Sequence, residues 1–293
     1  RGTQMDFARP EFLVDTDWLA AHLGDPGLVV LDTTTRLVPA PEVGTTPLSG
    51  RPAFERGHIP GARFVDLQAD LSAPDHAYRF MLPSAERFAA AMMRLGVGDA
   101  TRVVLYSTDN LWWSSRVWWM LRVFGHDNAV VLDGGWQKWA AEGRPAETGA
   151  APPCPPTHFT ARPPRPLMAD KAEVLAAIGD GAVCTINALR PEQHDGSGGV
   201  QYGRAGRIAG SVNVAAAQLI DPATGVLRSP AALRALFADV GALDRRVITY
   251  CGGGIAASAD ALVLTLLGHS DVKIYDASLI EWVTDAGLPM EVG

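Results

Sequence analysis

The stretch from Val247 to Ser258, which reads Val-Ile-Thr-Tyr-Cys-Gly-Gly-Gly-Ile-Ala-Ala-Ser, decides the fold. A short run with β-branched residues ends at Cys251, three glycines follow, and an alanine- and leucine-rich segment has helical spacing. This order predicts a strand, a tight loop and a helix. Backbone N–H groups at a glycine loop and helix N-terminus favour a thiolate and any anion attached to it. The pattern therefore favours a reactive Cys251 over the alternative of a small buried residue beside a turn.

The composition excludes several classes of protein. The chain has 293 residues, of which 47% are apolar, and this predicts two domains of ordinary size. Charged residues make up 19% and the net charge is −7, so we expect no nucleic-acid partner. No apolar run approaches the roughly 20 residues of a membrane span, so we expect no membrane contact. Residues 1–5 lack an apolar core, and no signal peptide is expected there.

The three cysteines are Cys154, Cys184 and Cys251. Their spacing matches neither a zinc site nor a disulfide framework, so we expect no metal and no cofactor. Unpaired cysteines fit a reducing cytoplasm and leave one thiol free for chemistry.

The chain repeats its own order of motifs. Segments of the second half match segments of the first at a nearly constant offset, which indicates an internal duplication. The matched pairs begin at Gly57 and Gly206, Val103 and Val247, Val130 and Val272, and Trp139 and Trp282. Strands alternate with helices in both halves, so each half is predicted to be a parallel α/β unit. Ligands in such sheets bind beyond the carboxyl ends of the strands, which is where Cys251 stands.

These patterns divide the chain into a first domain at residues 12–146, a linker at 147–168 and a second domain at 169–293. Prolines recur through the linker, which is therefore expected to be stiff and extended. Residues 36–57 are expected to form a polar, proline-punctuated loop. Asp133 and Asp276 end equivalent strands and are expected to cap the helices behind them.

At these residues the chain resembles the tandem-domain rhodanese sulfurtransferases. The motifs that carry the resemblance are Gly57-His58-Ile59-Pro60-Gly61-Ala62, the helix from Arg116 to Arg122, Asp133-Gly134-Gly135-Trp136 and the Cys251 loop. The resemblance covers residues 12–292 and implies two rhodanese-like domains, each a parallel sheet flanked by helices. It also implies that the first domain is catalytically inert, and Ser107 indeed occupies the position that matches Cys251.

The resemblance implies a sulfurtransferase that works through a persulfide on Cys251. Its donor would be a small anion, 3-mercaptopyruvate or thiosulfate, and its acceptor a thiol, a small protein or another nucleophile. The neutral loop favours mercaptopyruvate, because thiosulfate-preferring members carry cations after the cysteine. Backbone amides would hold the persulfide as an oxyanion hole holds oxygen. These amides belong to Gly252, Gly253, Gly254, Ile255 and Ala256.

The second half departs from the family where the donor should bind. The usual Asp-x-Arg after the strand reads Asn187-Ala188-Leu189 here, with an arginine one place later. The candidates for holding the donor's anionic end are Arg190, Arg204 and Arg207. Trp113 is expected either to form an apolar wall of the interdomain cleft or to pack in the core.

The first half also departs from the family. Mercaptopyruvate enzymes resembling this chain use an aspartate and a histidine of that half in proton transfer. Phe80 stands in the histidine's place and Gln68 in the aspartate's, while His76 and Asp66 lie near but out of register. A different donor or a specialised sulfur-delivery role therefore remains open.

Two rival hypotheses follow from the same residues. A phosphatase-like or arsenate-handling site needs a longer loop that ends in arginine, but Ala257 stands at the sixth position after Cys251. The other rival is a non-catalytic module in which Cys251 is a sulfur carrier or a relic.

Overall fold

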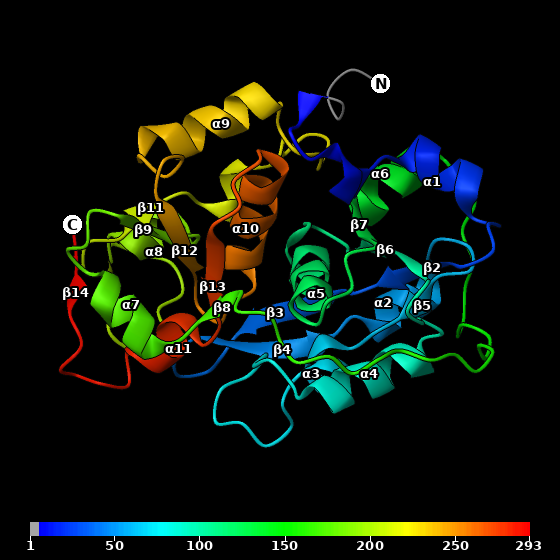
Figure 1. The fold of residues 1–293 in the computed structure, drawn as a ribbon, viewed down its shortest axis with the longest axis horizontal. Helices are drawn as coiled ribbons and strands as arrows, with labels where there is room; N and C mark the ends of the chain where they lie inside the picture. The colour runs from blue at the N-terminus through cyan, green and yellow to red at the C-terminus, as the bar shows by residue number, and fades with distance from the viewer. Residues whose placement is uncertain (1–5) are drawn as a thin grey trace.

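The computed structural model describes residues 6–293, and the expectation for residues 1–5 lies outside the described residues. Each half contains a parallel five-stranded sheet (Figure 1). The first sheet has the order β1 (Leu13–Val14), β7 (Ala129–Leu132), β6 (Arg102–Tyr106), β2 (Leu28–Asp32), β5 (Arg63–Phe64). The second has the order β8 (Met168–Ala169), β13 (Val272–Tyr275), β12 (Arg246–Tyr250), β9 (Val183–Asn187), β11 (Val212–Asn213). The two orders correspond strand by strand, which confirms the predicted pair of parallel sheets.

The helices surround these sheets, and two of them meet at the centre of the molecule. Helix α5 (Trp112–Val123) follows β6, and α10 (Ala256–Leu266) follows β12; they pack against each other between the halves (Figure 1). All side chains of α10 are buried, as expected for a helix enclosed on every side. The other helices of the first half are α1 (Thr16–His22), α2 (Arg51–Arg56), α3 (Leu67–Leu71), α4 (Ala85–Arg94) and α6 (Gly135–Ala141). Those of the second half are α7 (Lys171–Ala177), α8 (Pro191–His194), α9 (Pro230–Asp239) and α11 (Ser278–Trp282). Short 3-10 helices span Pro10–Phe12 and Ala216–Gln218.

The repeat extends to individual contacts. The hydroxyl of Tyr106, at the end of β6, accepts the backbone N–H of Ile59, and that of Tyr250, at the end of β12, accepts the N–H of Ile208. A short antiparallel pair, β10 (Arg207–Ile208) with β14 (Met290–Glu291), has its counterpart in a bridge between His58 and Glu147. The turns at Gly57 and Gly206 therefore hold equivalent places, although their sequences differ.

The prediction of a loop at residues 36–57 is wrong. Strand β3 (Thr35–Pro39) pairs antiparallel with β4 (Thr45–Ser49), and α2 follows. The hairpin leaves the first half and reaches the second, where the N–H of Gly44 donates to the carbonyl of Gln201 at 2.9 Å (Figure 1). It thus forms an arm of the first domain that lies against the second.

The expectation that Asp133 and Asp276 cap their own helices is also wrong. Neither α6 nor α11 has a side-chain cap; each carboxylate instead accepts a backbone N–H from the opposite half. Asp133 accepts the N–H of Leu227 and Asp276 that of Leu82, both at 2.8 Å. Burial raises the pKa of Asp133 to about 6. The equivalent aspartates of the two halves therefore make two reciprocal contacts between them.

Asp260 lies buried in the middle of α10. Neither of its carboxyl oxygens has a hydrogen-bond partner among the described residues. Burial raises the pKa of this carboxyl well above its ordinary 3.8, so the folded chain keeps this proton to a higher pH than the unfolded chain.

We therefore expect Asp260→Asn to stabilise the protein increasingly as the pH rises. The contribution of Asp260 to stability is greatest below its unfolded pKa and is lost as the pH rises toward its folded pKa. That loss amounts to about 1.4 kcal/mol per pH unit in this window, and a side chain that does not titrate avoids it. Urea unfolding between about pH 5 and pH 8 measures the effect. Asp239→Asn, at an exposed position in α9, is the control. A difference from wild type that is constant with pH would contradict the expectation.

Candidate functional site

Cys251 directly follows β12, the central strand of the second sheet. Its backbone N–H donates to Ser278 Oγ at 3.1 Å, and its carbonyl accepts the N–H of Leu279 at 3.1 Å. Helix α11 therefore fixes the start of the loop. The residue is only 3% exposed, but it lines a cavity between the two halves.

Glycine is required at two positions of the Cys251 loop. Gly254 has φ +78°, and a Cβ there would lie 2.5 Å from the carbonyl oxygen of Asp276. A Cβ on Gly252 would lie 2.1 Å from the ring of Tyr202. A side chain at position 254 would therefore displace the loop, whereas one at position 252 would push the Tyr202 ring out of its place.

The amides that follow Cys251 have no protein acceptor. Among the described residues, no hydrogen bond is donated by the backbone N–H groups of residues 252–256. These groups lead into α10 and end at its first residue, Ala256, where the N-terminal end carries the partial positive charge of the helix dipole. The loop thus presents unused donors beside a thiol.

The cavity at Cys251 has a volume of about 340 Å³. The second half contributes Leu189, Tyr202 and four of the five predicted loop residues, namely Gly252, Gly253, Ile255 and Ala256. Gly254 is outside the lining and approaches Asp276 instead. The first half contributes β3, the pair Arg79 and Phe80, the loop at 108–110, Trp112 and Trp113. Both halves are needed to build this cavity.

Trp113 lines the cavity and also packs in the core. Its ring makes an edge contact with that of Phe80, with the centroids 5.7 Å apart. Phe80 has a positive φ of 62° and is fully buried, and its N–H donates to Gln68 Oε1 at 3.0 Å. The Phe80 ring thus fills a wall of the cavity, and no histidine is among the described lining residues.

The three candidate arginines lie outside the cavity lining. Arg204 donates to the carbonyls of Asp285 and Leu288, and Arg207 donates to the carbonyl of Gly293. Arg190 is exposed before α8. The structure thus brings together the loop and Trp113 but none of these three side chains.

Two residues that sequence reasoning missed, Arg79 and Tyr202, face Cys251 in the cavity. Burial lowers the pKa of Arg79, while the neighbouring Tyr202 and Cys251 oppose that shift. Burial, with a smaller contribution from Cys251, raises the pKa of Tyr202 to about 12, so its hydroxyl remains a donor at neutral pH. The only sequence signal was that Arg79 directly precedes Phe80, the position of the family's histidine.

A buried ion pair ties the loop to the first half. Arg116 on α5 has a fully buried side chain and lies 2.6 Å from Asp276 Oδ1. It also donates to the carbonyl of Phe80 at 2.6 Å and to that of Gly254 at 3.4 Å. One guanidinium therefore connects both walls of the cavity.

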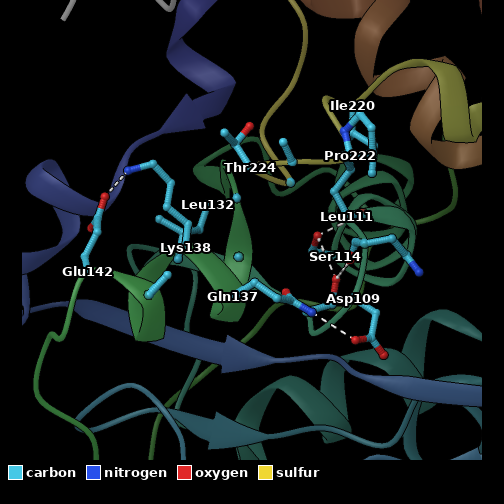
Figure 2. Close-up of a pocket in the computed structure, with 17 residues that line it drawn as sticks. Asp109, Leu111, Ser114, Leu132, Gln137, Lys138, Glu142, Ile220, Pro222 and Thr224 are labelled. Atoms are coloured by element: carbon cyan, nitrogen blue, oxygen red, sulfur yellow. Dashed lines mark hydrogen bonds and ion pairs between the residues drawn. The ribbon is translucent and has the colours of Figure 1, made fainter.

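A second cavity of about 610 Å³ lies at the position that the duplication makes equivalent (Figure 2). Ser107, the counterpart of Cys251, lines it and donates to the carbonyl of Asn110. Gln137 donates to Asp109 at 2.9 Å within the same cavity (Figure 2). With a hydroxyl in place of the thiol, this cavity has no sulfur nucleophile among its lining residues.

Two further findings concern the described residues alone. They include no group of three or more His, Cys, Asp or Glu side chains that could hold a metal ion. None of their helices combines the length and the apolar character that crossing a bilayer requires.

Comparisons with known proteins match most of the chain. The family described as "Rhodanese-like domain" matches residues 15–142 and 170–285. The chain is 33% identical to "Sulfur carrier protein TtuD" of Thermus thermophilus, with 99% of each chain covered. It is 35% identical to human 3-mercaptopyruvate sulfurtransferase, with 92% of this chain and 91% of the relative covered. The crystal structure of the Escherichia coli 3-mercaptopyruvate sulfurtransferase SseA superposes with a TM-score of 0.79 at 32% identity, covering 91% of this chain and 98% of the other.

Proposed function

The chain belongs to the rhodanese family and is a sulfurtransferase, and from this premise we propose that it moves sulfur through a persulfide on Cys251. The observation that carries the proposal is the thiol at the end of β12, facing a cavity and followed by five amides without protein acceptors. Such amides stabilise an anionic sulfur as it forms.

The proposed reaction has two steps. The Cys251 thiolate attacks the thiol sulfur of 3-mercaptopyruvate or the outer sulfur of thiosulfate, and an S–S bond forms at the protein. With 3-mercaptopyruvate the carbon–sulfur bond breaks and the carbon fragment takes a proton to leave as pyruvate; with thiosulfate the sulfur–sulfur bond breaks and sulfite leaves. An acceptor thiolate then attacks the outer sulfur of the persulfide and releases the Cys251 thiolate.

We propose 3-mercaptopyruvate as the preferred donor. The relatives named for this donor support it, and so does the uncharged loop at residues 252–256. The three free cysteines support a cytoplasmic place of action, since reducing compartments keep thiols unpaired.

A second role, as a sulfur carrier, is supported by the Thermus relative, which bears that name. In that role the outer sulfur of the persulfide would pass to a dedicated protein acceptor rather than to a small thiol. The absence of histidine from the described cavity lining favours this role, because no imidazole there assists rapid turnover.

The test is the intact mass of the protein after incubation with each donor. We expect 3-mercaptopyruvate to add one sulfur atom to the peptide that contains Cys251, faster than thiosulfate does at equal concentration. Release of that sulfur to dithiothreitol as sulfide supports turnover, whereas a persulfide stable to small thiols supports the carrier. No sulfur gain with either donor would contradict both roles.

A further inference from the structure

Arg79 is held over the Cys251 loop by the hairpin arm of the first domain. Its guanidinium donates to the carbonyl of Thr45 and, at 2.6 Å, to Thr45 Oγ1 on β4. These contacts fix two of the three nitrogens and leave Nε free. That buried N–H has no partner among the described residues. Nε lies 3.9 Å from where a Cβ of Gly253 would stand.

The charge around the cavity favours an anion. Its described lining contains two cations, Arg36 on β3 and the deeper Arg79, and one acidic residue, Asp109. The carboxylate of Asp109 accepts a hydrogen bond from Gln137, which lines the second cavity rather than this one (Figure 2). An anion that binds Arg79 would therefore meet little competition from protein carboxylates.

Tyr202 supplies a second donor on the opposite wall. Its ring and hydroxyl lie directly against Gly252 in the cavity lining. Because burial and Cys251 raise the pKa of the phenol to about 12, it donates at neutral pH. A small anion between Arg79 and Tyr202 would lie beside the sulfur.

We propose that Arg79, with Tyr202 opposite it, binds the anionic end of the sulfur donor at the Cys251 cavity, in place of an arginine of the second domain. This inference rests on the proposed function for the identity of the donor, but not for the binding of an anion. Leu189 lines the cavity at the position of the family's arginine. The arginines of the cavity lining belong to the first domain, so the anion has to be bound from that domain. The hairpin arm is thus part of the specificity of the site.

The test compares two alkylating reagents of nearly equal size, anionic iodoacetate and neutral iodoacetamide. Each forms a bond between Cys251 Sγ and carbon as iodide leaves, and peptide mapping separates Cys251 from Cys154 and Cys184. The ratio of the two rate constants, divided by the same ratio for glutathione, reports anion binding beside the thiol. We expect wild type to favour iodoacetate and Arg79→Met to lose about ten-fold or more of that preference, the value of one charge-assisted hydrogen bond.

Two variants separate anion binding from a purely structural role. Arg79→Lys keeps the charge and is expected to retain most of the iodoacetate preference. Arg87→Met removes another half-buried arginine that holds backbone carbonyls, those of Ser72 and Ala69, but lines neither cavity. It should leave the ratio unchanged. A similar drop in Arg87→Met, or no preference in wild type, would overturn the proposal even if Arg79→Met folds poorly.

The donor assay gives an independent result. If Arg79 binds the donor, KM for 3-mercaptopyruvate rises about ten-fold or more in Arg79→Met. An iodoacetate preference that depends on Arg79, in a protein that gains no sulfur from any donor, would support the anion site and reject the proposed function. Sulfur gain by a protein that shows no iodoacetate preference would support the proposed function and reject the anion site.

Discussion

Cys251→Ser will gain no sulfur from 3-mercaptopyruvate, and sulfur transfer will fall by about three orders of magnitude or more, as happens when a covalent nucleophile is lost. Serine preserves the size of the side chain and the hydrogen bond from the Cys251 N–H to Ser278. Its hydroxyl is far less ionised than a thiol at neutral pH and cannot form a persulfide. The measurement is the intact mass after incubation with donor, together with the rate of sulfide release.

Cys154→Ser is the matched control for this variant. Cys154 is a half-buried free thiol in the linker and lines neither cavity. It should gain one sulfur atom at the wild-type rate. Equal loss of sulfur transfer in both variants, or sulfur gain by Cys251→Ser, would move the chemistry away from Cys251.

Arg116→Met is expected to lower the free energy of unfolding by about 3–5 kcal/mol, the cost of leaving one charge of a buried pair without its partner. The side chain of Asp276 is only 8% exposed, so solvent compensates little for the missing guanidinium. The carbonyls of Phe80 and Gly254 would lose a donor as well. Urea unfolding monitored by tryptophan fluorescence measures the change.

Adding Asp276→Asn to Arg116→Met tests the electrostatic reason. Removing the unpaired carboxylate should restore part of the lost stability, because a neutral amide costs less to bury than a charge. Persulfide formation should be slower than in wild type in both variants, because Arg116 no longer holds the Cys251 loop and the Phe80 wall together. If Arg116→Met lowers the free energy of unfolding by less than about 1 kcal/mol, the expectation is contradicted, because ion pairs at protein surfaces contribute that little.

The fold was predictable because its signals are local. Short apolar strands alternate with helices, and Tyr-Cys-Gly-Gly-Gly marks the end of the central strand whatever surrounds it. The hairpin at β3 and β4 was not predictable in this way. Its strands carry exposed Leu37 and Leu48 and the prolines Pro39 and Pro47, so they resemble a loop. Contact with the second domain gives the arm its place.

The loop and Trp113 could be placed from sequence, but the arginine could not. Arg190, Arg204 and Arg207 were candidates because they lie near the family's position along the chain. Arg79 reaches the cavity only through folding, since it lies more than a hundred residues before Cys251 and depends on Thr45 for its orientation. Likewise, the bonds of Asp133 and Asp276 cross between the halves, which no local capping rule anticipates.

The reciprocal bonds of Asp133 and Asp276 limit how such a chain can be shortened. Each half accepts a backbone N–H of the other at the aspartate that follows an equivalent strand. The first half has Ser107 where the second has Cys251, yet deleting the first half would remove Phe80, Trp113 and Arg79 from the cavity around that thiol. The second half alone would therefore lack part of the cavity in which Cys251 lies, and both halves have to be kept together.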